Sequence, residues 1–413
     1  MWRKRLLMPV VGPVLLVTAA WAASASAGQK PRRPFMLWTR QEAAEIRKLI
    51  ESEAWAREAY ENETWGLLHY GIMGDKTAGE AEKQALLAAL AAEKVATPEN
   101  AYRYDVLYDL LTAQQRAQIE AAFVKAVQTG VSSMATRTHY TRWNWLPNLG
   151  YAWYSRLHEV AAATGDEKLI RQIFEGPNGF KLYLDEYLSD LGFYNEEFSK
   201  MYNTPQGLVH WCWAMERLGL DGIGWGYRGR QGATVRGHID SILRIGMPAT
   251  NLENGKLFFP RLTIGDTRGS GQFGIYGLQH SMFQLSRGPS RGDWYVELLQ
   301  IAHAKWPDEG YGWFLTHLGE SGQTTYNMPL RFGMPPIKPQ DISPPSAPSG
   351  VYPGRGLAVL RAEEGPEYWT SPAPAVGLRL ATPYGHFVHD SFALTGFYAL
   401  RRPIFANHSH ATN

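Results

Sequence analysis

The sequence contains a single cysteine, Cys212, among its 413 residues. One cysteine excludes an intrachain disulfide framework and a zinc site built from several thiolates. The flanking residues, VHWCWAM, are mostly apolar, which predicts a buried thiol.

The sequence also lacks an excess of charge of either sign, with 41 lysines and arginines against 39 aspartates and glutamates. Proteins that bind nucleic acid need a basic surface that neutralises phosphates. We therefore expect no nucleic-acid partner.

The apolar stretch near the N-terminus, LLMPVVGPVLLVTAAWA, is interrupted by Pro9, Gly12 and Pro13 and is short for a membrane-spanning helix. It lies between basic residues 3–5 and the small residues ASASA, which is the order of a secretory signal peptide. We predict that residues 1–27 are a signal peptide cleaved after Ala27. Its removal changes the formal net charge from +2 to −1, because three basic residues leave with it. The protein is expected to be periplasmic or extracellular, without stable membrane association.

At this length, and with 45% hydrophobic residues, the chain can form more than one folding unit. Thr39 and Glu42 have the spacing of a capping box at the start of a helix. The helical period that follows places four apolar residues on one stripe: Ala43, Ile46, Leu49 and Ile50. Further helical patterns joined by short loops continue through the chain. We predict a mainly α fold, with a toroid of helical hairpins over residues 28–332.

Residues 333–350, GMPPIKPQDISPPSAPSG, are rich in proline and predict an extended linker. Residues 351–413 then show strand-like alternation with turn residues between the strands. We predict a smaller antiparallel, sandwich-like β domain there.

The first stretch that suggests chemistry is HYTRWNWLPNLGYAWYSRLH. Aromatic faces with interleaved polar groups suit sugar rings, although the core of a helical domain explains the same composition. The aromatic members are Tyr140, Trp143, Trp145, Tyr151, Trp153 and Tyr154, and the polar members are His139, Arg142, Asn144 and Asn148.

The second stretch, SDLGFYNEEFSKMYNTPQGLVHW, predicts a loop holding Gly192 and Tyr194. Glu196 and Glu197 fit a solvated or loop-bracing pair. Tyr202 directly precedes a predicted helix, where its phenol could enter a cleft, although most tyrosines only pack and form hydrogen bonds.

The third stretch is YGHFVHDSFALTGFYALRRPIF. On a strand, His386 and Asp390 share one face and His389 lies on the other. A His–Asp pair can orient an imidazole for acid–base work or bind a metal, but two ligands are too few to define a metal site.

These segments resemble the heparinase II/III-like polysaccharide lyases and related alginate lyases. PFMLWTRQEAAEIRKLIES is similar to the opening of their toroid domain, and RWNWLPNLGYA resembles their Asn-Trp or Asn-His segment. DLGFYNEEFSKMYN resembles their D-G-x-x-x-E-x-S-x-x-Y segment, and GHFVHDSFALTGFYALRRPI resembles their G-H-x-H-x-D-x-L-S-F strand pair. The four segments occur in the family's order and cover most of the chain.

The resemblance implies three catalytic residues: Tyr202 as the phenol, His386 as the imidazole, and Asn144 as the group that holds the substrate carboxylate. Val388 replaces the family's second histidine, which is often linked to metal binding, so we predict no metal and no other cofactor. The predicted substrate-binding residues are His139, Arg142, Trp143, Trp145, Asn148, Tyr194 and Arg228.

A polysaccharide lyase must remove the weakly acidic C5 proton of a uronic acid. Hydrogen-bond donors on the adjacent carboxylate stabilise the enolate-like transition state. Asn144 suits this role, with help from His139 or Arg142. A phenol can take the proton and return it to the glycosidic oxygen when both lie on one face of the sugar, and His386 would be the base for the opposite epimer. The predicted partner is an acidic polysaccharide.

Two other functions fit the residues. A glycoside hydrolase would need two carboxylic acids across a cleft, such as Asp190 or Glu196 with Asp266. A glycan-binding protein without catalysis would keep the aromatic groove alone. Sulfate recognition would require an arginine cluster, for which GYRGRQGATVRGH offers Arg228, Arg230 and Arg236.

The β domain raises a question of completeness. Residues 350–413 have room for about four to six strands, and a sandwich needs a second sheet to cover its apolar face. We expect either a truncated copy of a longer protein or a short sheet shielded by the helical domain. Exposure of Phe392, Leu394 and Phe405 distinguishes these cases.

Overall fold

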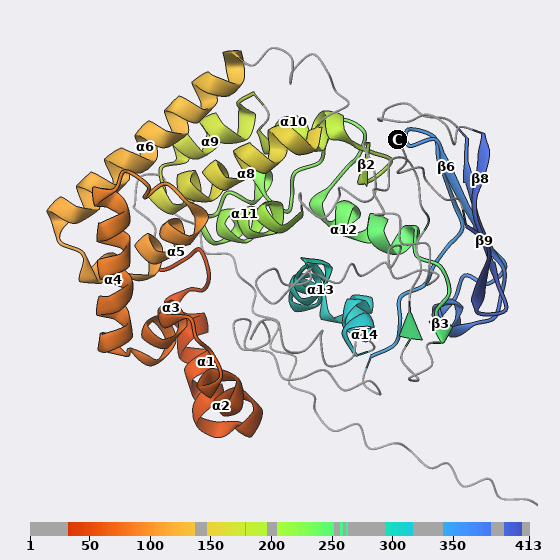
Figure 1. Ribbon diagram of the computed structural model, residues 1–413, viewed down its shortest axis with the longest axis horizontal. Helices are drawn as coiled ribbons and strands as arrows, with labels where there is room; N and C mark the ends of the chain where they lie inside the picture. Colours follow the sequence, from red (N-terminus) through yellow and green to blue (C-terminus); the bar gives the residue numbers. More distant parts are fainter. Residues whose placement is uncertain are drawn as a thin grey trace, which may run out of the picture.

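The computed structural model describes residues 32–136, 147–177, 179–195, 205–251, 257–258, 262, 294–316, 342–380 and 392–406. Figure 1 shows helices over most of the molecule and a β-sheet seen edge-on at its right. The chain is therefore mainly helical, with antiparallel strands in its C-terminal part, as the sequence predicted.

The helices follow one another with short connections. The longer helices are α1 (Arg40–Ser52), α2 (Ala54–Glu61), α4 (Lys76–Ala91), α5 (Pro98–Val106), α6 (Ala113–Thr136), α8 (Pro147–Thr164), α9 (Glu167–Glu175), α11 (Pro205–Arg217), α12 (Val235–Arg244) and α13 (Trp294–Lys305). Shorter helical segments are α3 (Gly66–Leu68), α10 (Phe180–Leu182), η3 (Tyr183–Tyr187), η7 (Pro307–Glu309) and α14 (Tyr311–Leu315).

Helix α1 begins at the predicted capping box. The Thr39 hydroxyl accepts a hydrogen bond from the Glu42 backbone N–H at 3.2 Å, and the Glu42 carboxylate accepts one from the Thr39 N–H at 2.5 Å. Three residues of the predicted stripe are buried, and Leu49 packs against the same cluster half-buried. The capping box and the spacing of the apolar stripe both depend on residues close together in the sequence. The sequence alone was therefore enough to locate this helix.

Two neighbouring helices end against residues 33–36. The Asp105 carboxylate, near the end of α5, accepts hydrogen bonds from the backbone N–H groups of Phe35 and Met36, both at 2.8 Å. It also pairs with the Arg33 guanidinium at 2.9 Å. That guanidinium donates to the carbonyl of Ala163, at the end of α8, at 2.5 Å. The carboxyl ends of α5 and α8 therefore meet at one segment.

Helix α11 ends at the same place. Arg217 donates to the carbonyls of Phe35 and Met36 at 3.2 and 3.1 Å. Lys305, at the end of α13, donates to Glu216 of α11 at 2.5 Å. Helix α8 packs against both α5 and α11, and the carboxyl ends of all three helices meet at residues 33–36. The three helices therefore run in the same direction. The N-terminal ends of α8 and α11 lie together on the side away from residues 33–36.

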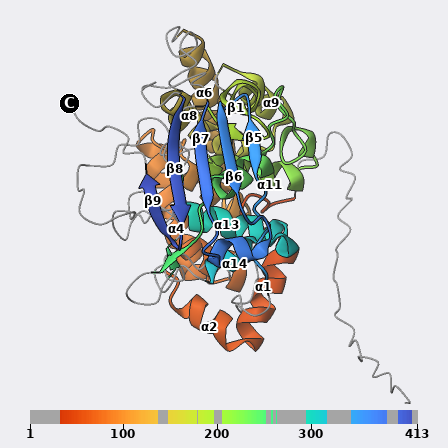
Figure 2. The same cartoon turned by 90° about the vertical axis from the view of Figure 1, so that its right-hand side faces the viewer.

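The C-terminal strands form one antiparallel sheet, seen face-on in Figure 2. Its order is β5 (Gly350–Tyr352), β6 (Leu357–Arg361), β7 (Ala375–Arg379), β8 (Ala393–Ala399) and β9 (Arg402–Ala406). Two two-stranded pairs lie in the helical part: β1 (Leu188–Ser189) with β2 (Phe193–Tyr194), and β3 (Thr250–Asn251) with β4 (Leu257–Phe258). Residues 342–349, inside the predicted linker, pack against the sheet, because Ala347 N–H donates to the Glu364 carbonyl at 2.8 Å.

The two faces of the sheet differ. On one face Arg361 donates to the carbonyls of Arg244 and Gly246, at 2.7 and 3.1 Å, and joins β6 to the end of α12. On the other face the described residues leave Val351 and Leu360 exposed. One face is therefore shielded by the helical part, and the other presents apolar side chains to solvent.

The residues chosen to test the sheet's completeness give a mixed result. Phe392 is 86% exposed and Leu394 is 38% exposed, while the side chain of Phe405 lies outside the described part. The condition for a fully shielded sheet, burial of all three, is not met.

Candidate functional site

Most of the predicted site residues lie outside the described part of the chain. These are Tyr202, His386, Asn144, His139, Arg142, Trp143 and Trp145. Asn148 lies in the first turn of α8, with its side chain outside the described part. Described residues near the flanks of two of these segments, 196–204 and 381–391, meet at one corner between the helices and the sheet.

The first part of the corner is the turn between β1 and β2, which directly precedes residues 196–204. Asp190 and Leu191 have φ of 41° and 72°, and Gly192 has φ of 148°. Such a run of left-handed residues is unfavourable and persists only where the surroundings fix it. The surroundings here include α12, because a Cβ on Gly237 would lie 1.7 Å from the Leu191 carbonyl oxygen.

A buried histidine holds this turn. His238 of α12 donates from Nδ1 to the carbonyl of Gly192 at 2.8 Å. Its Nε2 therefore accepts from the Tyr183 hydroxyl, 3.1 Å away. Burial lowers the pKa of His238 to about 4, so the ring is neutral at neutral pH. The turn is thus fixed by a neutral Tyr–His–carbonyl chain.

The sheet docks on the same turn through Asp190. One carboxylate oxygen accepts from the Gly354 N–H at 3.1 Å and the other from the Arg355 N–H at 2.5 Å. Both donors lie in the turn between β5 and β6. The rings of Phe193 and Tyr352 add a contact beside them, with centroids 4.4 Å apart. We call this group, Asp190–Phe193 with Tyr352–Arg355, the corner.

The segment that contains His386 starts near the corner. Leu380, the last described residue before 381–391, donates its N–H to the Gly356 carbonyl at 2.7 Å. Gly356 follows Arg355 directly. Residues 196–204, which contain Tyr202, follow strand β2, whose first residue Phe193 contacts Tyr352 of the corner. Residues 381–391, which contain His386, follow Leu380, which is hydrogen-bonded to the residue after Arg355.

Two predicted substrate-binding residues are described. Tyr194 lies in strand β2 rather than a loop, is fully buried, and stacks on Tyr183 with centroids 5.9 Å apart. Its role in this structure is packing. Arg228 is exposed, and no ion pair to it occurs within the described residues.

The other two arginines proposed for sulfate are paired with acids of the protein. Arg230 contacts Glu186 at 2.5 Å, and Arg236 contacts Glu309 at 2.8 Å. The three arginines therefore do not form one free cationic cluster.

Of the three carboxylates considered for a hydrolase, only one lies in the described part of the chain. Asp190 accepts hydrogen bonds from two backbone N–H groups, and Glu196 and Asp266 lie outside the described residues.

Cys212 is fully buried as predicted, and burial raises the pKa of its thiol well above the usual range, which makes it a poor nucleophile.

Within the described ranges, no group of three or more His, Cys, Asp or Glu side chains could hold a metal ion. Over the same part of the chain, no helix is both long and apolar enough to cross a bilayer. Comparison of the sequence with known proteins found no matching family model and no matching curated protein.

Proposed function

We propose that this protein is an exported polysaccharide lyase that cleaves a glycan containing uronic acid by β-elimination. The observation that supports the proposal is that the segments containing Tyr202 and His386 each follow an element near the corner, the first after strand β2 and the second after Leu380, which is hydrogen-bonded to Gly356. A lyase of this kind needs a phenol and an imidazole on one substrate, and these are the two segments that the sequence predicted to supply them.

A third segment fits the same arrangement. Residues 137–146, which contain Asn144, lead into the N-terminal end of α8, and residues 196–204 lead into the N-terminal end of α11. These two helices are neighbours and run in the same direction. Asn144 and Tyr202 therefore precede helix ends on the same side of the helical part.

We propose that the helices form a toroid of hairpins. Its support is that α5, α8 and α11 all end at residues 33–36, with the end of α13 beside that of α11. In a toroid, successive inner helices share one direction, so their ends and loops line a single face. The sheet beside this face would be one layer of a sandwich.

In the proposed reaction, Asn144 donates a hydrogen bond to the uronate carboxylate and stabilises the negative charge that develops when C5 loses its proton. Tyr202 takes that proton and transfers one to the glycosidic oxygen as the C4–O4 bond breaks. His386 is the base for substrates whose C5 proton lies on the opposite face. The C5–H electron pair becomes the C4–C5 double bond, and no external oxidant is required.

The test is to incubate purified mature protein with a panel of acidic glycans and to follow ultraviolet absorbance. A C4–C5 unsaturated product absorbs in the ultraviolet, so a lyase gives rising absorbance together with chain shortening. Shortening without absorbance would indicate a hydrolase. Binding without shortening would indicate a non-catalytic glycan-binding protein. Either result would overturn the proposal.

Which asparagine binds the substrate carboxylate can be checked separately. Asn144→Ala should abolish elimination and leave the folded state intact, since it removes a transition-state hydrogen bond and little packing. Asn148→Ala, four positions along the sequence, is the matched comparison. Loss of elimination in Asn148→Ala alone would move the role to that residue.

A further inference from the structure

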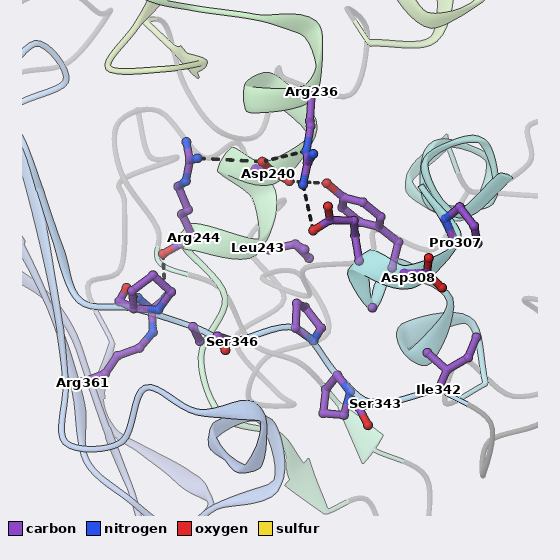
Figure 3. A pocket seen from close by; sticks show the side chains of 17 residues that line it. Arg236, Asp240, Leu243, Arg244, Pro307, Asp308, Ile342, Ser343, Ser346 and Arg361 are labelled. Carbon is purple, nitrogen blue, oxygen red and sulfur yellow. Dashed lines mark hydrogen bonds and ion pairs between the residues drawn. The ribbon is translucent and has the colours of Figure 1, made fainter. Parts of the chain in front are cut away.

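A cavity of about 660 Å³ lies between α12, the turn at residues 307–311, the extended residues 342–348 and strand β6 (Figure 3). This volume is in the range of small-molecule sites, about 300–1,000 Å³. Charged side chains line it together with Leu243, Ile342 and several prolines.

One side of the cavity is a closed polar network. The Tyr311 hydroxyl donates to the Asp240 carboxylate at 2.5 Å, and Arg236 pairs with Glu309 at 2.8 Å. Burial and the nearby Asp240 raise the pKa of Tyr311, so its hydroxyl stays protonated and keeps donating. These four side chains largely satisfy one another.

Arg244 is different. Its Nη2 stands 3.8 Å from Asp240, beyond hydrogen-bond distance, and its Nη1 is buried without a hydrogen-bond partner. Figure 3 shows its side chain on the opposite side of Asp240 from Arg236. The Nε of Arg361, also on the cavity wall, is likewise buried without a partner. Both of these nitrogens are shielded from solvent, but the Arg244 side chain as a whole is 23% exposed.

The charges of the lining limit what could use these donors. Three guanidinium groups face three carboxylates, so their formal charges cancel: Arg236, Arg244 and Arg361 against Asp240, Asp308 and Glu309. A polyanion would be repelled by the carboxylates, whereas one carboxylate can take a bidentate pair of hydrogen bonds from a guanidinium. Arg244 could supply such a pair, because its side chain is 23% exposed and its Nη2 is 3.8 Å from Asp240.

We propose that this cavity binds a small organic acid of monosaccharide size through its carboxylate, with Arg244 as the principal partner. The sugar-acid probe rests on the proposed lyase function, but the cavity and its donors do not.

The experiment measures binding of sodium glucuronate to the full mature protein by titration calorimetry. It is carried out in the Asn144→Ala background, so that the proposed catalytic carboxylate site does not contribute. Glucose is the uncharged control of similar size, and inorganic sulfate is the control anion. We expect glucuronate to bind and both controls to bind at least about tenfold more weakly.

Variants then locate the site. Arg244→Gln should weaken glucuronate binding by about tenfold or more, and Arg244→Lys should weaken it less, because the charge remains and the bidentate geometry is lost. Arg57→Gln, at an exposed arginine of helix α2, should leave binding unchanged. Thermal unfolding of each variant verifies that it is folded.

Three results would overturn this proposal: no glucuronate binding, equal binding to Arg244→Gln, or sulfate binding as tight as glucuronate binding. None of them depends on elimination activity. A protein that binds glucuronate at Arg244 but releases no unsaturated product would refute the lyase proposal alone.

Discussion

Two of the places where the helical part meets the sheet and its preceding segment have an aspartate at their centre. At the corner, both oxygens of Asp190 accept backbone N–H groups of the β5–β6 turn. At the cavity, Asp240 accepts the Tyr311 hydroxyl, while Arg236 and Arg244 stand 3.9 and 3.8 Å away. Backbone donors are fixed by the fold, whereas arginine side chains can rotate toward a ligand. The corner therefore fixes one chain segment against another, whereas the proposed role of the cavity is to bind a ligand.

The largest effect should come from filling the contact between the corner and α12. In Gly237→Ala the new methyl carbon would lie 1.7 Å from the Leu191 carbonyl oxygen, and backbone cannot move aside cheaply. We expect a loss of about 3 kcal/mol or more in the free energy of unfolding, measured with denaturant. Gly222→Ala is the matched control, because nothing lies within 4 Å of its added carbon. Equal stability of the two variants would contradict the proposed close contact.

The next effect should come from Asp190. Asp190→Ala removes the acceptor for two backbone N–H groups, and we expect a loss of about 2–3 kcal/mol. Asp190→Asn keeps one acceptor and tolerates the left-handed φ, so its loss should be smaller. Hydrogen exchange should accelerate at Gly354 and Arg355 in the alanine variant. Unchanged hydrogen exchange at Gly354 and Arg355 would show that Asp190 does not hold the β5–β6 turn in place. Asp109→Ala, at an exposed ion pair with Arg40, should change little.

A pH-dependent effect follows from His238, which faces Tyr183 and Tyr194 in the core. Its pKa is about 4 in the folded protein against 6.5 for the free side chain. Between these values the unfolded chain takes up a proton that the folded one does not. Its contribution to stability is therefore full above pH 6.5 and falls as pH decreases toward 4, by up to about 1.4 kcal/mol per pH unit. Titration of the imidazole by NMR measures this directly, and a pKa near 6.5 would contradict the buried chain at the corner.

The smallest loss of stability is expected on the outer face of the sheet, the face that carries Val351 and Leu360. Val359 is buried against the helical part, whereas its neighbour Leu360 is 47% exposed. Val359→Thr should cost about 1–3 kcal/mol, since it buries a hydroxyl. Leu360→Thr should stay within about 0.5 kcal/mol. Urea unfolding of the two variants compares the faces, and a larger loss for Leu360→Thr would mean that the outer face is covered.

The sequence predicted the features that depend on near neighbours. The capping box at Thr39, the apolar stripe of α1 and the buried Cys212 all follow from short patterns. The order of helices followed by antiparallel strands was predicted for the same reason.

The contacts that build the corner were beyond such patterns. Asp190 meets Arg355 across 165 positions, and His238 meets Gly192 across 46. Tyr194 was expected to reach a substrate, yet it packs against Tyr183, because the two-residue strand β2 turns it into the core. No local pattern marks Arg244 as a spare donor, since this follows only from the geometry of the assembled cavity.

The central proposal is that Tyr202, in the segment that follows strand β2, supplies a catalytic phenol. The Tyr202→Phe variant tests this proposal most directly. On a glycan from which the wild-type protein releases unsaturated product, we expect the initial rate of absorbance increase to fall by about a hundredfold or more, with KM nearly unchanged, because only proton transfer is lost. Tyr60→Phe, on the distant helix α2, should keep the wild-type rate. A Tyr202→Phe protein that releases product at the wild-type rate would contradict the account.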